Sequence, residues 1–288
     1  MSKKAVVTGG EGFIGTHLIE ALRGEGYEAV SVDIKSGGDI RDTQKLTEIF
    51  KGASYVFHTA ALPRVQYSIE HPQETSDANI EGTLSVLVAA RDAGVSRVVY
   101  SASSSAYGDQ KIMPLQEGMP ANPISPYALQ KHVGELYCRL FAEVYGLSTV
   151  SLRYFNVYGP GADPSGAYAL AIAKFLKQRQ ENTPITITGD GTQTRDFTHV
   201  KDVVRANILA ATSEKAGKGE VLNIGAGRGV SMNEIAQLIG GPVEHIAPRL
   251  EPHDTLANNS LARERLGWQP TVTIDEGIAE LKILAGLA

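Results

Sequence analysis

The feature that most constrains the fold of this chain is a glycine-rich turn between its first predicted strand and its first predicted helix. The turn reads TGGEGFIG and joins an apolar run at residues 5–8 to an amphipathic segment at residues 13–24. In its G-x-x-G-x-x-G spacing, Gly9 allows a tight turn, Gly12 lets the backbone approach a pyrophosphate, and Gly15 lets the helix pack closely on the sheet. Phosphates would bind the free amide groups at the start of that helix. The turn therefore predicts a dinucleotide-binding α/β fold.

One carboxylate favours a particular dinucleotide. Asp33 ends the second predicted strand, 18 residues after Gly15. A carboxylate at this position accepts hydrogen bonds from both ribose hydroxyls and repels a 2′-phosphate. We therefore expect the cofactor to be NAD rather than NADP.

Short apolar runs alternate with longer amphipathic segments through the first half of the chain. Further strands are expected at residues 29–32, 55–59, 98–101 and 149–153, and further helices at residues 73–93 and 126–145. Gly24, Gly94 and Gly146 are expected to end the three helices. This alternation predicts a Rossmann-type, doubly wound parallel sheet that is covered by helices on both faces.

The pattern changes after residue 156, where loop signals separate shorter elements. Strands are expected at 185–188 and 221–224, and helices at 169–180, 202–212, 231–239 and 275–284. We expect residues 1–155 to form the NAD-binding domain, to which segments near 197–226 return. Residues 156–288 should form mainly a smaller, mixed α/β lobe that binds the substrate.

Composition and charge argue against several other classes of protein. The 27 Lys and Arg residues are outnumbered by 32 Asp and Glu residues, so the net charge of −5 argues against a nucleic-acid-binding protein. No apolar run reaches the length that spans a bilayer, and a single cysteine, Cys138, excludes an intramolecular disulfide. Nothing in the sequence has the spacing of metal ligands. We expect a cytoplasmic protein.

A tyrosine and a lysine at helical spacing indicate proton-transfer chemistry. Tyr127 and Lys131 lie four residues apart, so they share one face of the helix predicted at residues 126–145. A phenol normally has a pKa of about 10, and a neighbouring cation stabilises its anion, which makes it a general base nearer neutrality. The serine-rich segment SASSSAYG ends a predicted strand 20 to 26 residues upstream. Ligands bind at such strand ends in parallel sheets.

Together these segments resemble the extended short-chain dehydrogenase/reductases. The glycine turn, the S-x-S-S-S-x-Y-G strand end and the Y-x-x-x-K helix carry the resemblance, and the segments RYFNVYGP, GDGTQTRDF and LGWQP extend it over nearly the whole chain. The branch that it resembles is the UDP-hexose 4-epimerases, which act on UDP-glucose or UDP-N-acetylglucosamine derivatives. The resemblance implies oxidation at C4 of the sugar by NAD, rotation of the 4-keto sugar, and return of the hydride to its other face.

The resemblance also implies roles for individual residues. Tyr127 would be the base, Lys131 its partner and a ligand of the nicotinamide ribose, and Ser103 a hydrogen-bond partner of the sugar O4. The cofactor would contact Gly9, Gly12, Phe13, Ile14, Gly15, Asp33, Asp39, Ile40, Thr59, Ala60, Ala61, Asn79, Ser101, Tyr127, Lys131 and Tyr154. The substrate would contact Arg64, Gln66, Ser68, Ser103, Ser104, Asn156, Arg195, Arg249, Glu251 and Thr255.

Within the substrate set, the resemblance separates the two ends of the nucleotide sugar. Asn156, Arg195 and Arg249 would hold the diphosphate, and Glu251 would meet the uridine ribose. Arg64, Gln66 and Ser68 would face the sugar. Thr255 would lie against the 2-substituent of the sugar, where a small side chain leaves room for an N-acetyl group.

The chain departs from the family pattern between Asp33 and Asp39. Only five residues separate these two positions, whereas the family usually has a loop and a full third strand there. We therefore expect the third strand to be very short or absent, which bears on Asp39 and Ile40 as adenine contacts.

Other functions on the same fold remain as alternatives. A 4,6-dehydratase needs an additional acid and base at the positions of Ser104 and Ser105, and a uronate decarboxylase needs the second of them. A 4-reductase or a uronate epimerase is a further alternative. A non-catalytic nucleotide-sensing protein is also possible because fold does not determine function, but it would be expected to lack Tyr127 or Lys131.

The resemblance finally implies a homodimer built through a four-helix bundle. The two helices of each subunit would be the segments at residues 73–93 and 126–145. The second segment has a broad apolar face formed by Val133, Leu136, Tyr137, Leu140, Phe141 and Val144.

Overall fold

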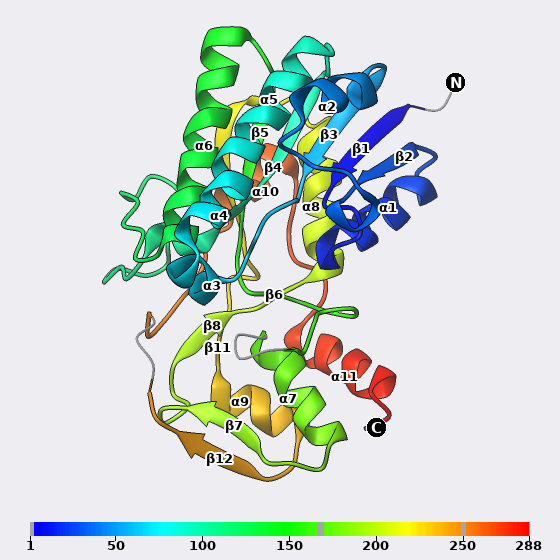
Figure 1. Cartoon of the computed structure of the whole chain (residues 1–288). Coiled ribbons are helices and arrows are strands. Elements are labelled where there is room, and N and C mark those ends of the chain that lie inside the picture. Colours follow the sequence, from blue (N-terminus) through cyan, green and yellow to red (C-terminus); the bar gives the residue numbers. More distant parts are fainter. Residues whose placement is uncertain (1–2, 166–169, 249–251, 288) are drawn as a thin grey trace.

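The computed structural model describes residues 3–165, 170–248 and 252–287, and its centre is a six-stranded parallel sheet (Figure 1). The strand order is β10-β5-β4-β3-β1-β2, and every pairing in the sheet is parallel. The strands are β1 (Lys4–Thr8), β2 (Glu28–Val32), β3 (Ala53–His58), β4 (Arg97–Ser103), β5 (Thr149–Tyr154) and β10 (Lys218–Ile224). The predicted Rossmann-type fold is confirmed.

Helices cover both faces of the sheet, because alternate residues of each strand point to opposite sides. On one face, Ala5 and Val7 of β1 belong to a core that includes residues of α1 (Phe13–Gly24), α8 (Val200–Thr212) and α10 (Ser260–Leu266). On the other face, Val6 belongs to a core that includes residues of α2 (Thr43–Phe50), α5 (Gly82–Asp92) and α6 (Pro126–Tyr145).

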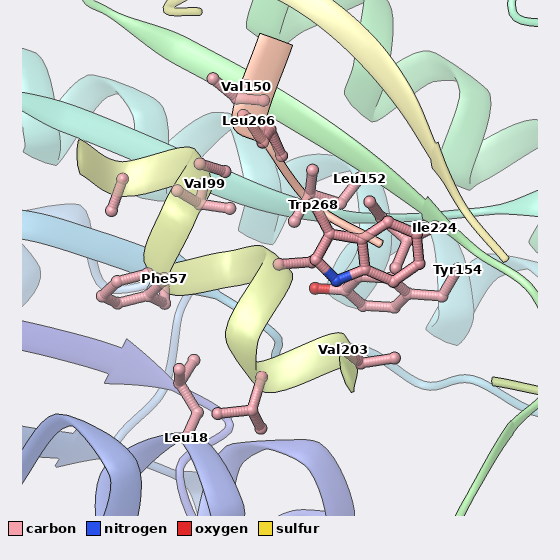
Figure 2. Close-up of a cluster of buried hydrophobic side chains, with 14 of the residues drawn as sticks. Leu18, Phe57, Val99, Val150, Leu152, Tyr154, Val203, Ile224, Leu266 and Trp268 are labelled. Atoms are coloured by element: carbon pink, nitrogen blue, oxygen red, sulfur yellow. The ribbon is translucent and has the colours of Figure 1, made fainter. Parts of the chain in front are cut away.

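The indole of Trp268 lies in the first of these cores (Figure 2). Its side chain is fully buried, and its Nε1 donates a hydrogen bond to the carbonyl of Asp202. The carboxylate of Asp202 accepts hydrogen bonds from the backbone amides of Thr271 and Val272. These contacts explain the LGWQP segment, because they hold the chain after α10 against the start of α8.

The structure confirms the shortened connection after Asp33. Residues 33–52 contain a 3₁₀ turn (Ile34–Ser36) and α2, and none of these described residues is in a strand. The amide of Gly38 donates to the carbonyl of Asp33, which closes a tight turn directly after β2. A Cβ atom at Gly38 would lie 2.9 Å from the backbone nitrogen of Asp33, so this turn needs glycine. β2 is therefore the last strand at its side of the sheet.

The smaller lobe lies at the end of the sheet where β5 leads into β6 (Figure 1). It contains the parallel pairs β6 (Val157–Tyr158) with β9 (Thr198–His199) and β7 (Ile185–Thr188) with β12 (Val243–Ile246). It also contains the antiparallel pair β8 (Thr194–Asp196) with β11 (Gly229–Ser231). Its core includes residues of α7 (Ala171–Gln180), α9 (Met232–Ile239) and α11 (Ile274–Leu284). The chain returns to the large sheet in between, through α8 and β10.

The predicted and observed elements agree best where the amphipathic pattern is long. α1, α6 and β7 have the predicted bounds, whereas the short helices α2, α3 (Val65–Glu70) and α10 were not predicted. The helix expected at residues 73–93 consists of α4 (Pro72–Ser76), a π-helical turn (Asp77–Glu81) and α5. Gly94 and Gly146 have the positive φ of helix-ending residues, but α1 continues through Gly24, and the positive φ is at Gly26. Among the described helices, none is long and apolar enough to cross a membrane.

Candidate active site

The glycine turn packs against the turn that follows β3. Gly9 has a φ of +72°, and a Cβ atom there would lie 2.7 Å from the backbone nitrogen of Ala60. A Cβ atom at Gly15 would lie 2.1 Å from the carbonyl oxygen of Gly9. Both positions therefore need glycine. Gly12 caps α1, and Phe13 begins it, so the free amides of the helix start lie beside the carboxyl end of β1.

Asp33 connects the end of β2 to this glycine turn. Its side chain is 7% exposed, and its two carboxylate oxygens accept hydrogen bonds from the amides of Glu11 and Lys35, each at 3.0 Å. Each oxygen keeps a further lone pair, so the carboxylate is held in place and can still accept ribose hydroxyls. The glycine cradle and this carboxylate fit an NAD molecule, with Phe13 and Ile14 half-buried beside them at the start of α1.

Asp39 and Ile40, the expected adenine contacts, have side chains that contact other residues of the protein. The carboxylate of Asp39 accepts hydrogen bonds from Nε and Nη2 of Arg41, and these lower the pKa of Asp39. The side chain of Ile40 lies against α5, because a Cβ atom at Gly82 would come within 2.5 Å of its Cδ1. Both residues follow the shortened connection after β2.

The turn after β3 is held from behind by Asn79. The hydroxyl of Thr59 donates to the carbonyl of Thr8 at 2.8 Å, and Ala60 and Ala61 follow. The buried amide of Asn79 bonds both the N–H and the C=O of Leu62, at 2.8 and 3.1 Å. Asn79 therefore supports the backbone of this turn.

Two further cofactor candidates are bonded to each other. The hydroxyl of Ser101 lies 3.0 Å from the phenol oxygen of Tyr154, and the amide nitrogen of Asn207 donates to that oxygen at 2.8 Å. Asn207 lies on α8 and is fully buried. The sequence did not single it out, because an asparagine within an apolar helix face gives no signal of its partner.

The structure brings Ser103, Tyr127 and Lys131 together at the carboxyl end of β4. Burial raises the pKa of the Tyr127 phenol to about 12, and a hydrogen bond with the Ser103 hydroxyl opposes this rise. Burial lowers the pKa of Lys131 to about 8, while the nearby Glu135 opposes this fall. The Lys131 ammonium donates to the carbonyl of Ser101 at 2.8 Å and lies 5.0 Å from the centre of the Tyr100 ring. A phenol in this environment becomes a base near neutrality only with positive charge beside it.

The Ser103 hydroxyl is hydrogen-bonded to Ser105. Its oxygen accepts hydrogen bonds from the backbone amide of Ser105 at 3.2 Å and from the Ser105 hydroxyl at 2.8 Å. Ser104 begins the short 3₁₀ turn that follows β4. Neither Ser104 nor Ser105 can replace a carboxylic acid in proton transfer.

A buried ion pair lies one helical turn beyond Lys131. The Glu135 carboxylate accepts hydrogen bonds from Nε and Nη2 of Arg153, at 2.7 and 2.6 Å, and the Arg153 guanidinium stacks 4.4 Å from the Tyr107 ring centre. The two side chains are 2% and 4% exposed. The i, i+4 spacing places Glu135 on the same face of α6 as Lys131, but no local pattern in the sequence links Glu135 to Arg153.

The three residues expected to face the sugar have different surroundings. The guanidinium of Arg64 pairs with the carboxylate of Asp163 at 2.7 Å. The amide of Gln66 donates to Glu70 on the exposed side of α3. Ser68 is fully buried, and its hydroxyl accepts a hydrogen bond from the backbone N–H of Tyr127.

The residues expected at the diphosphate lie where β5, β8 and the segment after residue 252 meet. Asn156 has a φ of +27°, and its amide nitrogen donates to the carbonyl of Asp196 at 3.1 Å and lies 3.4 Å from the hydroxyl of Thr255. Arg195 donates to the carbonyl of His253 at 2.9 Å. The two other candidates, Arg249 and Glu251, lie outside the described residues.

The carboxylate of Asp196, which was not among the predicted site residues, binds the backbone around Asn156 and Thr255. Asp196 is fully buried and accepts hydrogen bonds from the amides of Ala226, Gly227 and Ala257, at 2.7 to 3.0 Å. Burial raises the pKa of Asp196 to about 6. Its position next to Arg195 in the TRDF segment was the available signal.

Comparison with known proteins points to one group. A model of the NAD dependent epimerase/dehydratase family matches residues 5–225. The chain is 37% identical to a UDP-glucose 4-epimerase of Mycolicibacterium smegmatis, over 96% of each chain. Its structure is similar to the UDP-glucose 4-epimerase of Thermotoga maritima with UDP-glucose, with a TM-score of 0.91, 36% identity and 99% and 98% coverage. It is also similar to the UDP-N-acetylglucosamine 4-epimerase of Methanobrevibacter ruminantium in complex with UDP-N-acetylmuramic acid, with a TM-score of 0.91, 34% identity and 97% and 96% coverage.

Burial of the Lys131 charge should reduce the stability of the fold. Its pKa falls from 10.5 to about 8, so the unfolded chain binds the proton more tightly than the native one. The full penalty applies below pH 8 and fades between pH 8 and 10.5. Lys131→Met should therefore raise the free energy of unfolding of the NAD-free protein at pH 7 by roughly 1–3 kcal/mol.

Urea titrations of the parent and of Lys131→Met at pH 7, 8, 9 and 10 measure this difference. The gain should be largest at pH 7, change little up to pH 8, and shrink between pH 8 and 10. A stability gain that does not change with pH, or a variant less stable than the parent at pH 7, would show that the buried charge of Lys131 does not destabilise the fold.

Proposed function

This chain belongs to the NAD dependent epimerase/dehydratase family, and we propose that it is a 4-epimerase of a UDP-hexose or a UDP-N-acetylhexosamine. The match confirms both the resemblance to the extended short-chain dehydrogenase/reductases and NAD as the cofactor. One observation carries the proposal. Ser103, Tyr127 and Lys131 meet at the carboxyl end of β4, in the same sheet edge as the glycine cradle of α1.

The geometry supports a cycle without net oxidation. The Tyr127 phenolate removes the proton of the sugar C4 hydroxyl, Ser103 hydrogen-bonds the sugar O4, and the Lys131 ammonium stabilises the phenolate. NAD would be held by Gly9, Gly12, Gly15 and Asp33, and it would supply reversible hydride transfer at C4. Rotation of the 4-keto sugar about its diphosphate anchor presents its other face, so the returned hydride inverts C4.

The strand end argues against the dehydratase alternative. A 4,6-elimination needs an acid and a base beside the sugar, and Ser104 and Ser105 supply only hydroxyls. The Ser105 hydroxyl is already a donor to Ser103. A non-catalytic sensor is disfavoured because Tyr127 and Lys131 are both present and both lie at the site.

The choice of sugar is tested by direct turnover. The protein is incubated separately with UDP-glucose, UDP-N-acetylglucosamine and UDP-glucuronate, and proton NMR identifies the C4 epimer in each mixture. We expect epimerisation of UDP-N-acetylglucosamine, of UDP-glucose, or of both. Conversion of UDP-glucuronate alone would make it a uronate epimerase, and a dehydrated or reduced product would contradict the proposal.

Tyr127→Phe should keep the site but lose its base. The variant removes one hydroxyl, so NAD and UDP-sugar should still bind, while turnover should fall by two to four orders of magnitude. Bound NAD and UDP affinity are measured beside kcat. If Tyr127→Phe kept more than about a tenth of the parent activity, Tyr127 would not be the base.

Thr255 is proposed to set the size of the sugar 2-substituent. It is half-buried, and its hydroxyl lies beside Asn156 and the amide of Asp196. A tyrosine there would fill the volume of an acetamido group, and such overpacking typically costs about 1–3 kcal/mol. Thr255→Tyr should therefore lose activity on UDP-N-acetylglucosamine and keep activity on UDP-glucose. Equal loss on both substrates, or no change on either, would contradict this role.

We also propose that the protein is a homodimer through α5 and α6. One face of α6 presents an apolar stripe of Leu129, Val133, Leu136, Leu140 and Val144, of which Leu140 is 45% and Val144 62% exposed. Residues at this spacing share one face of a helix, and a stripe of this length on a helix surface is typical of an interface.

Light scattering should give twice the 30.8 kDa mass of the chain. Leu140→Lys should shift the protein toward the single-chain mass, because a charge would be buried in the bundle. Ile283→Lys is the matched control, since Ile283 is also exposed but lies on α11. A parent mass near 31 kDa at micromolar concentration would overturn the dimer.

A further inference from the structure

Ser68 of α3 binds the first turn of α6, where the other backbone amides already have partners. The hydroxyl of Ser125, the N-cap residue of α6, accepts a hydrogen bond from the amide of Ala128 at 3.2 Å, and the Ser125 carbonyl accepts one from the amide of Leu129. Pro126 has no N–H. The remaining donor of the turn is the N–H of Tyr127, and the hydroxyl of Ser68 accepts it at 3.0 Å. Every amide of the turn that carries Tyr127 is therefore paired.

The Ser68 hydroxyl has no proton left for a sugar. Ser68 is fully buried in α3, and its one O–H donates to the carbonyl of Val65. A hydroxyl has a single donor and two acceptor lone pairs. The bond to Val65 fixes the orientation of the hydroxyl, and one of its lone pairs accepts the hydrogen bond from the N–H of Tyr127. The hydroxyl therefore acts on the backbone of the catalytic residue.

A second tie joins the same two segments. The amide nitrogen of Asn79 donates to Oε1 of Gln130 at 2.8 Å, and Asn79 also holds both backbone groups of Leu62. Gln130 lies between Tyr127 and Lys131 in sequence and is buried. The segment 62–79, which follows the cofactor turn, is thus bonded to α6 at the catalytic tyrosine and again three residues after it.

We propose that Ser68 is a positioning residue for Tyr127, which fixes the first turn of α6 against the segment that follows the cofactor turn. This inference rests on the proposed function of Tyr127 as the base. Without the hydroxyl, a buried N–H loses its partner and the turn must shift to find another. A shift of the phenol relative to Ser103 and Lys131 lowers the rate without weakening contacts to the sugar, because misplacement of reacting groups by about 1 Å can cost 100-fold.

The test compares Ser68→Ala with two controls. Ser68→Thr keeps the hydroxyl and should retain most of the activity. Thr149→Val removes another fully buried hydroxyl that bonds α6, since Thr149 Oγ1 donates to the carbonyl of Cys138 at 2.7 Å. That bond lies eleven residues beyond Tyr127, so its loss should lower the melting temperature and leave kcat unchanged.

In Ser68→Ala we expect kcat to fall about 10- to 100-fold and KM to change less than twofold. The acid limb of the kcat–pH profile should move to higher pH, because the phenolate loses part of the stabilisation by Lys131. Deuterium exchange of the peptide covering residues 125–131 should become faster in Ser68→Ala and stay unchanged in Thr149→Val.

Three outcomes separate the hypotheses. An unchanged kcat and unchanged exchange at residues 125–131 in Ser68→Ala would overturn the positioning role. A rise in KM with constant kcat would also overturn it and place Ser68 at the sugar. If the parent itself shows no turnover, the proposed function fails, while the exchange measurement still tests the anchor. If Ser68→Thr does not fold, the comparison of Ser68→Ala with Thr149→Val still tests the positioning role.

Discussion

Polar groups buried on α6 impose the constraint on which the site depends. Gln130, Lys131 and Glu135 are each less than 5% exposed, and an unpaired buried polar group is costly. Each bonds at least one residue of another element: Asn79 and Thr75 for Gln130, the Ser101 carbonyl for Lys131, and Arg153 for Glu135. Together these bonds hold α6 against sliding or rotation. The phenol of Tyr127, one turn before Lys131, is placed by the same restraint.

The buried charge of Lys131 lowers the stability of the fold, and the proposed function gives this cost a purpose. A lysine with a pKa of about 8 holds its charge at neutral pH against the cost of burial. An apolar residue of similar length would pack there without that cost. The Glu135–Arg153 pair contributes negative charge at one helical turn from the ammonium, but its own charges are neutralised mutually, so it offsets only part of the penalty. An ammonium stabilises a neighbouring phenolate by its positive charge, and the low dielectric of a buried site strengthens this effect.

The sequence predicts the parts of this design whose signal is local. The glycine turn, Asp33 and the Tyr127–Lys131 spacing each follow from a few neighbouring residues, and the missing third strand follows from the short distance between Asp33 and Asp39. The partners of α6 do not, because Asn79, Ser101 and Arg153 lie 30 or more positions before Lys131 or on a later strand. Ser68 shows the limit most directly. Its place after the turn at Ala60 suggested the sugar, but burial in a helix of only six residues turns its hydroxyl to Tyr127.

In the proposed function, the residues of catalysis and those of substrate selection are held by separate parts of the fold. The reacting groups are held by α6, β4 and the segment 62–79, which belong to the large sheet and its helices. Asn156 and Thr255 instead bond the backbone carbonyl and amide of Asp196, and Arg195 donates to the carbonyl of His253. The Asp196 carboxylate fixes this backbone by accepting the amides at positions 226, 227 and 257. A substitution at Thr255 therefore changes the surroundings of Asn156 without touching any partner of Lys131 or Tyr127. Under the proposed function, such a division lets substitutions in the lobe change the accepted sugar while the groups that act at C4 keep the same geometry.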